Sequence, residues 1–305
     1  MNPSLDSLPD RVRRHTTDEV RWAIDAATRE NVWRRATAGP RQTARRIARL
    51  DRTWDVERTL GANASTLAVA GSILGLAVNR RWFALPAAVS GFLLQHAVRG
   101  WCPPLPLLRR LKVRTRSELD QEKYALKALR GDFADDLKGR PTAERVISAV
   151  AAPPAPPSAD RLRRRHASAR AESPDRQLEE SVRRHLSASR ESLTARILAL
   201  QQEWSVERHL QAAAATLGLG SALLAFLHHQ RWGYVTAVGM TLLLLHTVSG
   251  ADPLRLSLRR RGIRTRAQID REIYALKCLR GDFDAVNGHE TGGQRVEAAL
   301  AAVGL

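Results

Sequence analysis

The amino-acid sequence repeats itself at a constant shift of 150 residues. The segment that starts at Arg114, RTRSELDQEKYALKALRGDF, returns at Arg264 as RTRAQIDREIYALKCLRGDF, and 14 of the 20 positions are identical. The same shift relates Trp54 to Trp204 and Trp82 to Trp232 without a gap. A repeat of this length predicts a tandem duplication, in which two copies of one structural unit follow each other along the chain.

The repeat also sets the predicted boundaries. We place the first copy at residues 1–150 and the second copy at residues 161–305. The stretch between them, AAPPAPPSAD at 151–160, is rich in Pro and Ala. Such a stretch cannot continue a helix and predicts a semi-rigid linker.

Each copy contains two stretches that lack Asp, Glu, Lys and Arg, although 26% of the chain is charged. They cover residues 60–78 and 82–98 in the first copy, and 210–227 and 232–248 in the second. These lengths lie at the lower end of the range for a membrane-spanning helix. The alternative is a soluble bundle whose buried helix pairs carry no charge.

The ends of these stretches favour the membrane. Tryptophans, which concentrate at the membrane interface, lie at or just outside the ends: Trp54, Trp82, Trp101, Trp204 and Trp232. The flanking segments are far more basic than the short connections within each pair, which places the N- and C-termini in the cytoplasm. We therefore predict an all-α integral membrane protein. It would contain two tandem hairpins, four short transmembrane helices and amphipathic cytoplasmic helices.

The charge balance narrows the choice of partner. The chain has 49 Lys and Arg against 31 Asp and Glu, a net charge of +18, which indicates an anionic partner. The arginine-rich runs at 161–170 and 256–266 have no interleaved aromatic residues, and no RNA-recognition, KH or zinc-finger signature is present. Anionic lipid is therefore the favoured partner. The alternative is a soluble, basic, helical nucleic-acid-binding protein.

Two glycines in the first uncharged stretch, Gly71 and Gly75, form a GxxxG pattern. Small residues four apart let helix backbones approach closely in lipid. The pattern predicts self-association, either between the two copies or between two chains.

The order of motifs resembles a known family. Each copy has Trp-x-Val-Glu-Arg-x-Leu, an Ala/Gly-rich stretch, a short connection with Arg-Trp and a second apolar stretch; in the first copy GWCPPLPLLRRL (100–111) follows. This resembles the YgaP-like inner-membrane domain family, small bacterial transmembrane hairpins of mostly unknown function. The resemblance implies a helical hairpin in the bacterial inner membrane and gives little support to an enzyme activity. The second copy has Asp252-Pro253 where the first has Cys102-Pro103.

The repeated segment itself predicts an amphipathic helix at 115–131 and again at 265–281. Thr115 with Glu118 forms a capping box, and Gly131 suits the C-terminal end. The apolar arc of this helix suits a membrane surface or a docking partner. Glu122 lies inside the arc without a basic residue three or four positions away, so we predict that it pairs with Arg58.

The sequence contains no motif for a catalytic site, a cofactor or a metal. A polar cluster of equivalent residues is expected near the cytoplasmic surface: Glu57, Arg58 and His96, with Glu207, Arg208 and His246. Cys102 is a candidate reactive thiol beside basic residues. The leading prediction is a structural, anchoring or scaffolding membrane protein. A membrane protein that handles thiols or sulfur through Cys102 is a further alternative.

Overall fold

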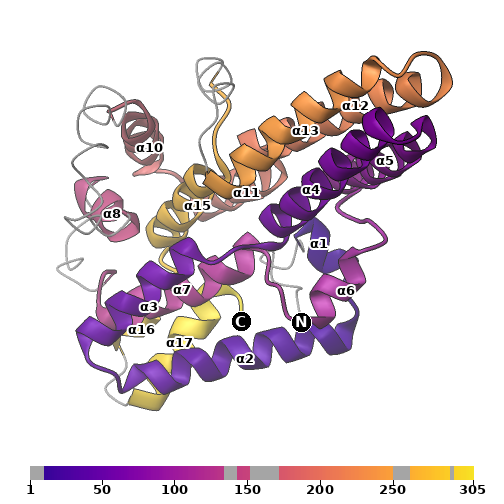
Figure 1. Ribbon diagram of the computed structural model, residues 1–305. Coiled ribbons are helices and arrows are strands. Elements are labelled where there is room, and N and C mark those ends of the chain that lie inside the picture. Colours follow the sequence, from indigo (N-terminus) through magenta and orange to yellow (C-terminus); the bar gives the residue numbers. More distant parts are fainter. Residues whose placement is uncertain (1–9, 134–142, 152–171, 250–261, 289–291) are drawn as a thin grey trace.

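The computed structural model describes residues 10–133, 143–151, 172–249, 262–288 and 292–305, and within these ranges the regular structure is entirely helical (Figure 1). The predicted linker falls, apart from Ala151, outside the described residues. In the first copy the helices are α1 (Arg11–Arg14), α2 (Asp18–Ala36), α3 (Pro40–Arg52), α4 (Val56–Ala77), the 3-10 helix η2 (Arg80–Phe83), α5 (Ala84–Arg99), α6 (Leu105–Arg110), α7 (Arg116–Arg130) and α8 (Ala143–Val150). In the second copy they are α10 (Glu172–His185), α11 (Arg190–Gln202), α12 (Val206–Leu227), α13 (Trp232–Ser249), α15 (Arg266–Arg280), α16 (Asp284–Gly288) and α17 (Gly292–Val303).

The repeated segment forms α7 and α15, and local chemistry defines both ends of each helix. The side chain of Thr115 accepts from the backbone N–H of Glu118, and the side chain of Glu118 accepts from that of Thr115. Thr265 and Gln268 make the same reciprocal pair in α15. Both helices end at a glycine with positive φ, which relieves the strain that a side chain would cause there: φ is 90° at Gly131 and 87° at Gly281. The predicted capping boxes are therefore present.

The surroundings of α7 differ from the prediction of a helix lying on a membrane surface. Helices α2, α3 and α17 pack around it, and it also contacts α15. Five of its charged side chains are buried, each with an exposed fraction of 5% or less: Glu118, Asp120, Glu122, Lys123 and Lys127. The membrane-surface alternative was wrong, because the polar residues that resemble a solvent-facing side are used for buried ion pairs and hydrogen bonds. The alternative of a docking helix fits these contacts.

Helices α7 and α15 meet through equivalent residues. The rings of Tyr124 and Tyr274 stack with centroids 3.7 Å apart, and those of Phe133 and Phe283 stack at 4.1 Å. A residue can touch its own equivalent only where it lies close to a twofold axis. The two copies are therefore related by an approximate twofold axis that passes between these rings.

The C-terminal helix of each copy packs on the other copy. Helix α8 contacts α10 and α15, whereas α17 contacts α7 and α2. The ammonium group of Lys127 donates to the carbonyls of Ala149 (2.9 Å) and Ala151 (2.6 Å) at the end of α8, and Lys277 donates to that of Ala302 near the end of α17. Burial, followed by the charge of Lys123, lowers the pKa of Lys127 to about 8. The two copies thus share one core.

A four-helix bundle projects from this core (Figure 1). In it, α4 packs against α5 and α13, and α12 packs against α13 and α5. Among the described residues, three helical stretches are long and apolar enough to cross a membrane: Pro40–Ala77, Arg190–Leu227 and Trp232–Ser249, whose apolar 18-residue windows have mean hydropathies of 1.4, 1.7 and 1.2. Helix α5 is shorter, at 16 residues. We call the end where α4 and α12 begin the base of the bundle, and the opposite end its tip.

The bundle buries small residues. The interior side of α4 is formed largely by Gly61, Ala62, Ser65, Ala68, Gly71, Ser72 and Gly75. A β-carbon on Gly71 would lie 2.7 Å from Cδ of Pro86, and one on Gly75 would lie 2.8 Å from the ring of Phe83. Both glycines therefore let η2 and α5 of their own copy approach α4 closely, whereas self-association through them stays a prediction.

The tip of the bundle combines a large residue in one copy with a small one in the other. Phe83 is fully buried, and the equivalent residue of the second copy is Gly233. A β-carbon on Gly233 would overlap the Phe83 ring. The space near the axis therefore holds one aromatic ring but not a second side chain.

We expect Gly233→Ala to lower the free energy of unfolding by about 1–3 kcal/mol, the usual effect of overpacking. The measurement is thermal unfolding of the detergent-solubilised chain. Gly91→Ala is the matched control, because no atom lies within 4 Å of a β-carbon at Gly91. Phe83→Leu should partly restore the stability of the Gly233→Ala protein, and equal effects of the two alanine substitutions would contradict the packing described.

Candidate functional site

Polar side chains of both copies converge at the base of the bundle, and two arginines link the copies there. Nε of Arg58 donates to the carbonyl of Thr247 (2.6 Å) and Nη2 to that of Val248 (2.8 Å), at the end of α13. Arg208 makes the equivalent bonds to Ala97 (2.7 Å) and Val98 (3.0 Å), at the end of α5. The last carbonyls of a helix have no partner within it, and a cation there also complements the helix dipole.

Tryptophans hold these two arginines in place. The guanidinium of Arg58 lies 4.5 Å from the ring centroid of Trp54, and that of Arg208 lies 3.7 Å from the centroid of Trp204. The conserved spacing Trp-x-x-x-Arg within the two copies therefore has a structural use. Each arginine is stacked on its own copy and hydrogen-bonded to the other copy.

A chain of three side chains lies beside this junction in the first copy. Nε2 of His96 is 2.9 Å from Oε2 of Glu57, and Nδ1 of His96 is 3.7 Å from Sγ of Cys102. The exposed fractions of His96 and Cys102 are 0% and 1%. The order thiol, imidazole, carboxylate is the order in which a general base activates a nucleophile.

Helix α1 closes this site. Nη2 of Arg11 lies 3.0 Å from Oε1 of Glu57, and Nη1 donates to the carbonyl of Ala97 (2.8 Å), which also accepts from Arg208. Val12 is buried in one apolar cluster with Cys102. Sequence reasoning missed the contribution of Arg11, because this residue lies 85 positions before His96.

The second copy does not repeat the chain. Oε2 of Glu207 accepts from the backbone N–H of Arg266 (3.0 Å), and His246 is only half-buried. The residue equivalent to Cys102 is Asp252, which lies outside the described residues. Of the six predicted cluster residues, the structure places Glu57, His96 and Arg208 together, whereas Arg58 lies at the corresponding place on α13.

Glu122 pairs with two arginines other than the predicted one. Its carboxylate oxygens lie 2.7 Å from Nε of Arg46 and 2.5 Å from Nη1 of Arg114. The prediction of Arg58 was wrong because Arg58 is used to cap α13. In the second copy, Glu272 pairs with Arg196 and Arg264 and accepts from Ser181. Both arginine positions are identical in the two copies, which is the signal that could have identified them.

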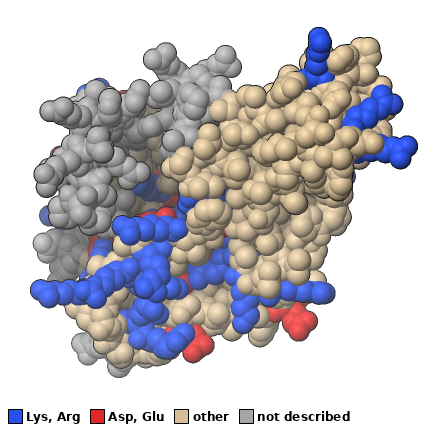
Figure 2. Space-filling view, viewed as in Figure 1, with Lys and Arg blue, Asp and Glu red and all other residues tan. Residues whose placement is uncertain are grey.

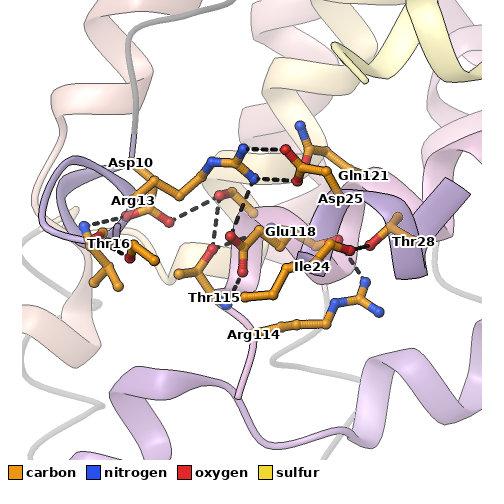
Figure 3. A network of polar contacts seen from close by, with 12 residues as sticks. Asp10, Arg13, Thr16, Ile24, Asp25, Thr28, Arg114, Thr115, Glu118 and Gln121 are labelled. Atoms are coloured by element: carbon orange, nitrogen blue, oxygen red, sulfur yellow. Dashed lines mark hydrogen bonds and ion pairs between the residues drawn. The ribbon is translucent and has the colours of Figure 1, made fainter. Parts of the chain in front are cut away.

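A second buried network ties the N-terminal helices to α7 (Figure 3). Arg109, 1% exposed, donates to both oxygens of Glu118 at 2.8 and 2.6 Å. Arg13 reaches the same carboxylate at 3.2 Å and also forms a bidentate pair with Asp25. Bidentate pairs of this kind hold both partners in one geometry. They fix α1 and α2 against α7, and hence fix the position of α1 over Cys102.

A carboxylate pair lies close to the twofold axis. Asp120 bonds Arg116 at 2.7 Å and Asp270 bonds Arg266 at 3.0 Å, and the two carboxyl groups influence each other's charge. Burial raises the pKa of Asp270, the charge of Arg266 opposes this shift, and Asp120 reinforces it.

Among the described residues, no three His, Cys, Asp or Glu side chains are placed to hold a metal ion.

No protein-family model, no curated protein and no solved structure matches this chain.

The pairing of Glu122 can be tested by double-mutant cycles. We expect Glu122→Gln with Arg46→Ala to be strongly non-additive in the free energy of unfolding, because both changes remove the same contact. Glu122→Gln alone, which takes the carboxylate from Arg46 and Arg114 together, should cost roughly 3–5 kcal/mol, and Arg46→Ala alone should cost less, because Arg114 still pairs with Glu122. Glu122→Gln with Arg58→Ala should be additive, since these side chains have different partners. Coupling in the second cycle but not in the first would contradict the contacts.

Proposed function

We propose that this chain is an integral membrane protein in which α4, α5, α12 and α13 cross the bilayer. The observation that carries the proposal is the distribution of side-chain size in the bundle. Its interior is lined largely by Gly, Ala, Ser and Thr, whereas large apolar residues point outward. A soluble bundle gains stability by burying its large apolar side chains. A bundle in lipid has no such driving force and packs through small residues.

The outward apolar residues occur along all four helices. Sixteen of them are at least 41% exposed: Leu67, Ile73, Val78, Trp82, Phe92, Val98, Leu217, Leu223, Leu224, Leu227, Trp232, Tyr234, Val238, Leu242, Leu245 and Val248. Figure 2 shows one face of the bundle without a charged residue between its basic tip and its basic base. Helix α4 has 22 residues, about 33 Å at 1.5 Å per residue, which matches the hydrocarbon core of a bilayer.

Several hydroxyl groups inside the bundle are satisfied locally, which suits a lipid environment; Oγ of Ser90 is an exception and has no partner among the described residues. Ser65 donates to the carbonyl of Gly61 (2.6 Å) and Ser72 to that of Ala68 (2.7 Å). Ser221 and Thr236 bond each other across α12 and α13 at 2.7 Å. Small hydroxyl residues of this kind link helices in membranes.

The orientation follows from the basic residues. The base adjoins the arginine-rich helices, whereas the tip carries only Arg80, Arg81 and Arg231, so the positive-inside rule places the base in the cytoplasm of a bacterial cell. The two copies would then be parallel repeats about an axis along the membrane normal. Trp54 and Trp204 would lie at the cytoplasmic interface beside anionic lipid. This arrangement, and the resemblance to YgaP-like hairpins, support an anchoring or scaffolding role.

We expect the full-length chain to stay in the membrane pellet after alkaline carbonate extraction. Topology reporters inserted after Arg80 and after Gln230 should both report the periplasm, and a reporter after Leu305 should report the cytoplasm. Release of the chain with peripheral proteins would contradict the proposal. If the released chain then shifts DNA in a salt-sensitive way, the soluble nucleic-acid-binding alternative is favoured.

A second candidate function is thiol chemistry at Cys102, which the chain Cys102–His96–Glu57 favours. The carboxylate orients the imidazole, and the imidazole can take the thiol proton at Nδ1. The other cysteine, Cys278, has no such partner: burial, followed by the charges of Asp284 and Asp282, raises its pKa to about 12. The two thiols of one chain therefore differ in environment.

Alkylation by iodoacetamide tests this function. Sγ of Cys102 would form a bond to carbon, iodide would leave, and the thiol proton would pass to His96. We expect His96→Gln to slow alkylation of Cys102 on the order of tenfold, and to leave Cys278, the internal control, unchanged. Equal rates in the two proteins, measured by mass spectrometry at neutral pH, would show that Cys102 is only a packing residue.

A further inference from the structure

A basic cleft lies between α2 and α3, away from the site described above. Its volume is about 330 Å³, and five arginines account for most of its lining. The lining residues are Arg34, Arg35, Ala38, Gln42, Arg45, Arg46 and Arg49. A volume of this size can enclose a small ligand.

The positive charge in this basic cleft is only partly neutralised. Arg46 is used by Glu122 at 2.7 Å, and Arg34 lies 3.5 Å from the exposed Glu30. Within the described ranges, no carboxylate forms an ion pair with Arg35, Arg45 or Arg49. Burial, followed by the charge of Arg46, lowers the pKa of Arg35, as expected where cations crowd together. The cleft therefore holds three guanidinium groups that an anion would stabilise.

The second copy shows that the fold does not need these arginines. Its equivalent helices α10 and α11 keep Arg196, the counterpart of Arg46, which binds Glu272 as Arg46 binds Glu122. The counterparts of the three arginines without ion pairs are His185, Ala195 and Ala199. One arginine with a structural use is thus present in both copies, whereas the three that line the cleft without a carboxylate partner occur only in the first.

We propose that the basic cleft binds a small soluble anion that carries two or more phosphate groups. Guanidinium groups bind phosphate oxygens in pairs and remain charged at any physiological pH. The lining contains no aromatic ring that could stack on a nucleotide base and no carboxylate that could bind a sugar hydroxyl. The arginines would therefore recognise the phosphate groups themselves. Inorganic tripolyphosphate and nucleoside triphosphates should therefore bind alike.

The position of the cleft favours a soluble source of phosphate over a lipid headgroup. The connection between α2 and α3 lies at the opposite end of the molecule from the tip of the bundle (Figure 1). Helix α3 has 13 residues, about 20 Å, and leads away from the base of α4. Arg49 lies in the last turn of α3, near the base, whereas Arg34 and Arg35 lie in the last turn of α2, beside the far end of α3. A lipid headgroup at the base of the bundle would therefore not span the cleft.

The test is calorimetric titration of the full chain in zwitterionic detergent with inorganic tripolyphosphate, ATP and monophosphate. We expect one equivalent of tripolyphosphate or ATP to bind with similar affinity, and monophosphate to bind much more weakly. Arg45→Ala with Arg49→Ala introduces the residues that the second copy already has, so the fold should persist. This double substitution should weaken the binding of tripolyphosphate by at least about tenfold. Arg183→Ala with Arg184→Ala, on α10, is the control of equal charge and should change affinity by less than about twofold.

A converse variant tests the same idea by gain of function. His185→Arg, Ala195→Arg and Ala199→Arg together should raise the stoichiometry from one to two. The proposal is overturned if tripolyphosphate does not bind or if the cleft and control variants bind it equally. It is also overturned if Arg45→Ala with Arg49→Ala abolishes binding only to phosphatidylglycerol vesicles or only to duplex DNA. None of these results depends on whether the bundle crosses a membrane.

Discussion

The contact of α7 with α15 about the twofold axis is the constraint on which the other elements depend. Tyr124 stacks on Tyr274 and Phe133 on Phe283, so each copy supplies the surface that the other needs. Around this contact, α8 and α17 pack on the opposite copies, and Arg58 and Arg208 cap each other's helices. A single copy would leave the tyrosine and phenylalanine faces of α7, and the ends of α5 or α13, without partners.

The fused arrangement allows positions near the axis to differ between copies. In a symmetric dimer, every substitution appears twice, and two large side chains would collide at the axis. Here Phe83 lies against Gly233, and Gln211 extends across Gly61 to the carbonyl of Glu57. The same freedom lets Cys102 and the basic cleft occur in one copy alone. The two copies thus have equivalent helices but different polar and reactive side chains.

The two halves of the molecule follow opposite packing rules. The core around α7 and α15 buries large aromatic and aliphatic side chains together with ion pairs, as in a water-soluble protein. The bundle buries small residues and turns large apolar residues outward. Arg58 and Arg208 lie where the two regions meet. There the guanidinium groups can bond the last carbonyls of α13 and α5 and still lie at the edge of the bundle, beside its basic base.

The sequence by itself determined the capped helices α7 and α15 and their ends. It also identified three of the apolar stretches that the structure shows to be long enough to cross a membrane, because helix caps, apolar runs and repeats depend on residues close together in the chain. It placed Glu57 near His96 because a short connection brings their helices side by side. Only the tertiary structure decided which cations neutralise Glu122, that α7 is buried, and that Arg11 closes the Cys102 site. Those outcomes depend on contacts between residues far apart in the chain: 76 positions for Arg46 and Glu122, 85 for Arg11 and His96, and 182 for Gln121 of α7 and Val303 of α17. Charged side chains of one type can satisfy several partners equally well until packing selects one.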